Sequence, residues 1–161
     1  MRGTITAVLA AVALTLAAGC SNDGGGGDEK GALSATEFAQ KANRLCSEAA
    51  SDRQTILSGI DPEASGPEQA EQLAGIIDID QKLLEEVDDL VPPQKDQDTV
   101  DQLLDEWRDR LDLEDQLREA TANEDAGEVS ALQSQVEEVD GRANPIAGGL
   151  LLNECTRGER V

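Results

Sequence analysis

The amino-acid sequence predicts an all-α protein, a four-helix up-and-down bundle stapled by one disulfide bond. Apolar residues recur three and four positions apart in four separate segments, which is the period of a helix with one buried face. No run alternates with the two-residue period of a strand, and turns rich in glycine, proline or polar residues separate the segments. Because the connections are short, neighbouring helices are expected to be antiparallel.

The first helix is predicted to begin at a capping residue, Ser34 or Thr36, since a serine here lies three positions before a glutamate. A turn containing two glycines and two prolines follows at residues 58–67. The second helix is expected from about Glu68 until the consecutive prolines that begin at Pro92. The residues of these helices expected to face the core are Phe38, Ala42, Leu45, Ala49, Ile56, Leu73, Ile76, Ile77, Leu83, Leu84, Val87 and Leu90.

The third helix is predicted from about Lys95 to Ala122, and the fourth follows a polar turn at residues 123–125. Pro145 should kink the fourth helix, because proline removes one backbone hydrogen bond. Gly148-Gly149 should then let the chain leave the helix and turn toward the first one. The core-facing residues expected here are Val100, Leu103, Leu104, Trp107, Leu111, Val129, Leu132, Val136, Val139, Ala143, Ile146 and Leu150.

Residues 1–19 are predicted to be an export signal. Met1-Arg2 supplies a positive charge, an uncharged run follows from Ile5 to Leu16, and small residues stand at 17–19. The run is shorter than the roughly 20 apolar residues that a membrane-spanning helix needs.

The segment Leu16-Ala17-Ala18-Gly19-Cys20 resembles the lipobox of bacterial lipoproteins. The resemblance implies that a diacylglyceryl group is attached to the Cys20 sulfur, that the peptide is cut before this residue, and that the new amino group often receives a further acyl chain such as palmitate. Stable anchoring needs at least two chains, which agrees with this chemistry. The alternative is an ordinary secretory signal followed by an incidental cysteine.

Four units are therefore expected along the chain. The signal is followed by the lipidated cysteine and a flexible tether at 20–33, since four consecutive glycines among charged residues do not pack. The helical domain covers 34–157 and a short tail covers 158–161. The expected location is the extracytoplasmic face of the cell membrane, with the membrane reached through the lipid.

The helical part also resembles small actinobacterial lipoproteins that are built as disulfide-stapled helical bundles. The resemblance implies this architecture and location, and it implies no activity. The residues that carry it are Phe38, Ala42-Asn43, Cys46, Leu90-Val91-Pro92-Pro93 and Cys155.

The two remaining cysteines, Cys46 and Cys155, form an even pair in a compartment expected to be oxidising, which predicts a structural disulfide. A zinc site is disfavoured, because two cysteines without histidine supply too few ligands. A redox-active pair would be more closely spaced.

Composition excludes several function classes. The chain has 34 acidic and 13 basic residues, so its formal charge of −21 repels nucleic acid and no nucleic-acid partner is expected. It has no histidine and no tyrosine, and Phe38 and Trp107 are its only aromatic residues. Neither a Gly-x-Ser-x-Gly nor a Ser-x-x-Lys motif occurs. We therefore expect a non-enzymatic protein with no cofactor beyond the covalent lipid on Cys20.

An acidic face runs along the predicted third helix. Its members lie three or four positions apart and fall on one side of the helix. They are Asp98, Asp101, Asp105, Asp109, Asp112, Asp115 and Glu119. This face could bind divalent cations or a basic partner, or it could be a solvated surface that Arg108 partly neutralises. An EF-hand is excluded, because the turn glycine and ligand spacing are missing.

A second group of polar residues, Asp52, Arg53, Asp80 and Glu114, lies at or near core positions. Buried, these residues could bind a small ligand or set helix register through an arginine pair. Charged residues are seldom buried, so placement at the helix edge is expected, with Ile79 facing the core in place of Asp80.

Two functional hypotheses remain. The leading one is a non-enzymatic module that binds a protein or another cell-envelope component through a helical face. The alternative is a lipoprotein that binds divalent cations or a small ligand, through the acidic face of the third helix or a cavity between helices.

Overall fold

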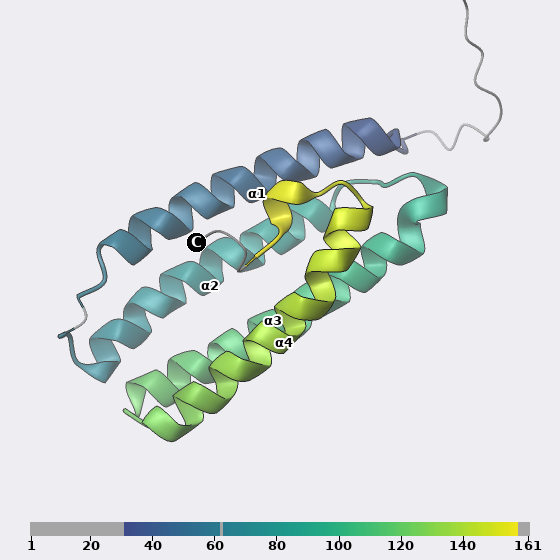
Figure 1. Cartoon of the computed structure of the whole chain (residues 1–161). Helices are drawn as coiled ribbons and strands as arrows, with labels where there is room; N and C mark the ends of the chain where they lie inside the picture. The colour runs from purple at the N-terminus through teal and green to yellow at the C-terminus, as the bar shows by residue number, and fades with distance from the viewer. Residues whose placement is uncertain (1–30, 62, 158–161) are drawn as a thin grey trace, which may run out of the picture.

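A computed structural model describes residues 31–61 and 63–157, and within these ranges the protein is all-α (Figure 1). The predicted signal, Cys20, most of the tether and the tail lie outside the described residues. The helices are α1 (Ala35–Ser58), α2 (Gly66–Asp88), α3 (Gln97–Ala122) and α4 (Ala126–Gly149), with short 3₁₀ helices η1 (Gln94–Asp96) and η2 (Asn153–Cys155). The four helices run up, down, up and down, as predicted. Among the described residues, none of the helices has the length and apolar character needed to span a membrane.

Side-chain caps explain where the helices start. Ser34 is the N-cap of α1: its hydroxyl accepts a hydrogen bond from the Glu37 N–H, and the Glu37 carboxylate accepts from the Ser34 N–H at 3.0 Å. The Glu68 carboxylate accepts in the same way from the Ser65 N–H at 2.9 Å, so α2 starts two residues earlier than predicted. Such reciprocal bonds satisfy N–H groups that a helix start leaves without partners.

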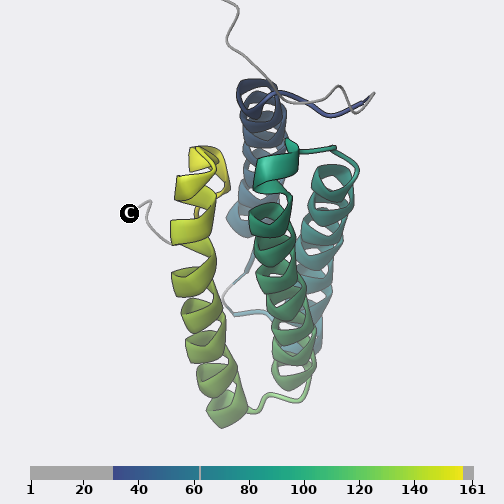
Figure 2. The same ribbon diagram turned by 90° about the vertical axis from the view of Figure 1, so that its right-hand side faces the viewer.

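The bundle is open along one side. α1 packs along α2, α2 along α3, and α3 along α4, whereas α1 and α4 do not pack along their lengths. Figure 2 shows α4 standing apart from α2 on the far side of α3. A C-terminal segment, residues 150–157, crosses from the end of α4 to α1 and contains η2 (Figure 1).

The apolar core fills one end of the bundle, where α1 and α3 begin and α2 and α4 end. Its members include Phe38, Ala42, Cys46, Ala49, Leu83, Val87, Val100, Leu103, Leu104, Trp107, Ala143, Ala147, Leu152 and Cys155. Outside this core, the buried apolar residues are Ala70, Ala120, Leu132 and Val139. Several predicted core residues toward the other end, among them Leu73, Ile76 and Val129, are only partly buried. The interior is therefore closed at one end and incomplete at the other.

The predicted disulfide is present, and it ties the C-terminal segment to α1. The Cys46 and Cys155 sulfur atoms are 2.04 Å apart. The Asn43 amide spans the same gap: it donates to the Leu151 carbonyl and accepts from the Glu154 N–H, both at 2.8 Å. The segment therefore takes the place that direct packing of α1 against α4 would occupy in a closed bundle.

The chain leaves α4 differently from the prediction. Pro145 lies inside α4, whose last turns change direction in Figure 1, and both Gly148 and Gly149 remain helical. The reversal falls on Leu151, which has φ +60°. A leucine thus occupies the left-handed position that glycine usually takes after a helix.

Candidate ligand-binding groove

Six charged side chains meet on the open side of the bundle, and every helix contributes at least one. We call them the charge cluster. Its members are Arg53 from α1, Asp80 from α2, Arg110 and Glu114 from α3, Asp140 from α4, and Arg157 from the C-terminal segment. The cluster contains three acidic and three basic groups, so its formal charge is balanced in a protein of charge −21.

Asp80 is the centre of the charge cluster and is only 4% exposed. Arg157 donates to both carboxylate oxygens, from Nη1 at 2.7 Å and from Nη2 at 2.8 Å. Arg110 Nη1 donates to Oδ2 at 3.2 Å, and Arg53 Nη1 donates to Oδ1. Burial by itself raises the pKa of Asp80, but the hydrogen bonds and charge of Arg157, followed by the other two arginines, outweigh it and lower this pKa. Asp80 is therefore held in its ionised form.

Glu114 has one satisfied and one unsatisfied oxygen. Arg110 Nη1 lies 2.5 Å from Oε1 and also contributes to the Asp80 contacts, while Arg110 Nε donates to Asp140 at 2.9 Å. Oε2 is buried and has no hydrogen-bond partner among the described residues. Burial raises the pKa of Glu114, and the nearby charge of Arg110 only partly offsets this effect.

The expected placement of these acids at a helix edge is wrong. Asp80 is 4% and Glu114 9% exposed, whereas Asp52 does lie on the surface. A buried carboxylate is costly only when it lacks counter-charges, and here three arginines supply them. Arg157 follows the disulfide, so its position could not be derived from helical periodicity.

A sequence signal for the charge cluster did exist. Asp80 continues the seam of Ile76, Leu83 and Val87 at spacings of four, three and four. The α3 seam is equivalent, with Trp107, Arg110, Glu114 and Leu117 also three or four apart. By itself, this spacing predicts that Asp80, Arg110 and Glu114 face the interior of the bundle, even though charged residues are seldom buried.

The charge cluster forms part of the wall of a cavity of about 640 Å³ between α1, α2, α3 and the C-terminal segment. Arg53, Asp80, Arg110, Glu114 and Arg157 line it. Its apolar lining residues are Ala50, Leu57, Leu73 and Ile76, and the remaining lining residues are polar: Ser47, Ser51, Gln54, Glu154 and Thr156.

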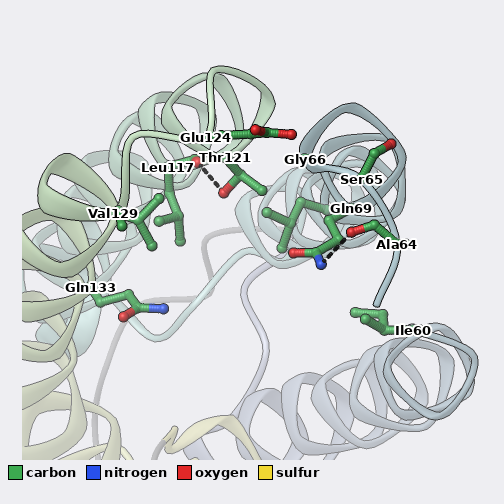
Figure 3. Close-up of a pocket in the computed structure, with 12 residues that line it drawn as sticks. Ile60, Ala64, Ser65, Gly66, Gln69, Leu117, Thr121, Glu124, Val129 and Gln133 are labelled. Carbon is green, nitrogen blue, oxygen red and sulfur yellow. Dashed lines mark hydrogen bonds between the residues drawn. The ribbon is translucent and has the colours of Figure 1, made fainter. Parts of the chain in front are cut away.

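A second cavity, of about 500 Å³, lies where the α1–α2 and α3–α4 turns approach each other (Figure 3). Its larger apolar lining residues are Ile60, Leu73, Leu117 and Val129. Figure 3 shows Leu117 and Val129 on the side of α3 and α4, facing Ile60 and Gln69 across the space. Leu73 lines both cavities, so they adjoin. We call the two cavities together the groove.

Gly66 sets the edge of the apolar cavity. A Cβ atom at this position would lie 2.4 Å from the Thr121 carbonyl oxygen and 2.7 Å from Glu124 Cγ. Only glycine permits this approach of the start of α2 to the end of α3.

All seven members of the predicted acidic face are exposed on α3. Arg108 contacts Asp105 at 2.7 Å and Asp88 at 3.5 Å, and Arg118 contacts Asp115 at 3.1 Å. Within residues 31–61 and 63–157, no group of three or more potential ligands is arranged to hold a metal ion.

Fold and groove together define a disulfide-stapled helical bundle with one open side. No family model, no curated protein and no solved structure matches this chain. The groove must therefore be interpreted from its own chemistry.

Proposed function

We propose that this chain is a membrane-anchored, extracytoplasmic lipoprotein that acts as a non-enzymatic binding module, and that the groove is its binding site. The observation that carries the proposal is the incomplete interior: a charged wall and an apolar cavity adjoin at Leu73, where a closed bundle would have core side chains. Ligand sites are typically concave, mostly apolar, and fixed by a few converging polar groups.

The unsatisfied oxygen of Glu114 supports a binding role. A buried polar atom without a partner costs about 1–3 kcal/mol, so few persist in native proteins without a reason. Glu114 is one of the residues that line the larger cavity, so a rotation of its carboxylate toward a bound molecule would let that molecule supply the missing hydrogen bond. The proposal includes no chemical step, because Asp80 and Glu114 are held by arginines and the sequence contains no histidine.

The proposed location rests on the N-terminal sequence and agrees with the disulfide. The lipobox-like segment ends at Cys20, and the Cys46–Cys155 bond is of a kind that persists in oxidising compartments. The expected ligand or partner is therefore a component of the cell envelope. Attraction to nucleic acid is opposed by the charge of −21.

The anchor is tested by mass spectrometry of full-length protein from the membrane fraction, compared with Cys20→Ser. We expect an N-terminal peptide that begins at Cys20 and carries acyl chains, and the loss of both acylation and detergent-dependent extraction in Cys20→Ser. Recovery of wild-type protein from the cytosol with residues 1–19 intact contradicts the anchor.

The groove is tested with the fluorescent probe 1-anilinonaphthalene-8-sulfonate on the full chain carrying Cys20→Ser. We expect saturable binding that Leu117→Gln strongly weakens, because this residue lines the apolar cavity. The matched control is Leu111→Gln, a partly buried leucine of the same helix that lines neither cavity. Near-ultraviolet circular dichroism checks that each variant is folded. Equal probe binding by both folded variants contradicts the groove as a binding site.

A further inference from the structure

We propose that the groove binds a single-chain lipid with a zwitterionic head group that ends in a primary ammonium. The head group lies against the charge cluster, and the acyl chain lies in the apolar cavity. This inference rests on the proposed function, because it names the ligand class of the same groove.

The charge balance of the cluster selects the net charge of the ligand. Three arginines face Asp80, Glu114 and Asp140, so the buried charges already compensate one another. A ligand with a net charge would leave one charge without compensation in a poorly hydrated site, which is costly. A zwitterion adds a positive and a negative group together and keeps the balance.

The hydrogen-bonding groups that line the charged cavity indicate which two charged groups the zwitterion carries. Glu114 Oε2 is a buried acceptor without a partner, and an ammonium supplies N–H donors to it. Arg53 uses only Nη1 in its contact with Asp80, so Nη2 and Nε remain able to donate to an anionic oxygen. Planar guanidinium groups suit phosphate oxygens particularly well. One cavity wall thus offers partners for both an ammonium and a phosphate.

The apolar cavity selects the remainder of the ligand. It shares Leu73 with the charged cavity and lies between the two interhelical turns, lined by Ile60, Leu117 and Val129. An elongated apolar body attached to a compact polar head follows this path. A single acyl chain has this shape, and removing it from water supplies a hydrophobic driving force.

The test uses three lipids with the same sixteen-carbon chain and different heads. Titration calorimetry below the micellar concentration compares lysophosphatidylethanolamine, lysophosphatidylcholine and lysophosphatidylglycerol on the full chain carrying Cys20→Ser. The choline head is zwitterionic but has no N–H donor, and the glycerol head leaves a net negative charge. We expect the ethanolamine lipid to bind about tenfold or more tightly than either of the others, as one charged hydrogen bond implies.

Glu114→Gln provides the discriminating variant. It should lower affinity for the ethanolamine lipid to about that of the choline lipid and leave choline-lipid binding nearly unchanged. Glu119→Gln, an exposed acid of the same helix, is the matched control and should change neither affinity.

The possible outcomes separate this inference from the proposed function. Equal affinity for all three lipids, or an equal effect of Glu114→Gln on each, overturns the head-group assignment. If no lipid binds while the fluorescent probe still binds in a Leu117-dependent manner, the assignment of a lipid ligand is overturned. The groove then remains a site for another ligand, such as an apolar peptide. Loss of Leu117-dependent probe binding instead overturns the proposed function.

Discussion

At Asp80, one carboxylate accepts hydrogen bonds from three guanidinium groups on three different parts of the chain. The residue links α2 to α1, to α3 and to the C-terminal segment at a single point. Because the three arginines together outweigh the cost of burial, the pKa of Asp80 is lowered. The stability that Asp80 supplies is thus fully present above the usual carboxyl pKa and is lost as pH falls through the folded-state value.

Replacing Asp80 with asparagine should destabilise the fold by about 3–5 kcal/mol at neutral pH, because it leaves buried arginines without their shared counter-charge. Urea unfolding followed by circular dichroism measures the change. Asp78→Asn, an exposed acid of the same helix, should stay within about 0.5 kcal/mol of the wild type. An Asp80→Asn midpoint equal to that of the wild type would show that the charge cluster contributes nothing to stability.

Sequence reasoning failed at these residues for a physical reason. A buried carboxylate is improbable without counter-charges, and the spacing within one helix does not show which arginines supply them. The partners that make Asp80 and Glu114 tolerable come from other elements, including Arg157, which is 77 positions from Asp80. Local spacing indicates which face a residue lies on, but it does not reveal the countercharge that a distant segment brings.

At the scale of a helix, the end of α4 carries a conformational cost. The Leu152 N–H donates to the Ala147 carbonyl at 2.8 Å and the Leu151 N–H donates to the Gly148 carbonyl at 3.1 Å, which is the Schellman arrangement. Leu151 occupies its left-handed position with φ +60°, and its side chain is 66% exposed. The side chain therefore gains little from packing in return for the unfavourable backbone conformation.

Leu151→Gly should stabilise the protein, by up to about 1 kcal/mol once the greater freedom of glycine in the unfolded chain is subtracted. Thermal unfolding should show a raised midpoint. Leu150→Gly is the comparison: Leu150 has φ −87° and is partly buried, so its replacement should lower the midpoint. A lower midpoint for Leu151→Gly would mean that its exposed side chain makes a stabilising contact.

The existence and order of the helices followed directly from the sequence. Periodicity gave four helices, and Ser34, residues 58–67 and Pro92 marked ends close to those observed. The open side of the bundle could not be predicted from the sequence. Apolar periodicity shows that a helix has an inner face, but it does not show how closely two helices approach. The partial exposure of Leu73 and Val129 reflects this: each has the spacing of a core residue and lines a cavity instead.

At the scale of the whole molecule, the disulfide and the C-terminal segment connect α4 to α1, two helices that do not pack along each other. Cys155 bonds Cys46, Asn43 holds the backbone at Leu151 and at Glu154 within η2, and the Asn144 amide donates to the Arg157 carbonyl at 2.7 Å. Each of these contacts fixes the same short stretch of backbone. Removal of one should therefore weaken the others.

Replacing both Cys46 and Cys155 with alanine should cost about 4–5 kcal/mol, because the bond closes a loop of 109 positions. Denaturant unfolding of oxidised wild type and of the double variant measures the loss. Reduced wild-type protein is the control and should resemble the double variant. If all three unfold at the same denaturant concentration, the noncovalent contacts alone secure the C-terminal segment.

The position of these contacts along the chain has a consequence for the order of assembly. The α2–α3 and α3–α4 hairpins join neighbours in sequence and can form early at low entropic cost. By contrast, α1 finds the partners of Asn43 and Cys46 only in residues 151–155, more than 100 positions later. The contacts of Asn43 and Cys46 can therefore form only after residues 151–155 are present, and closing this long loop is expected to be the slow step of folding.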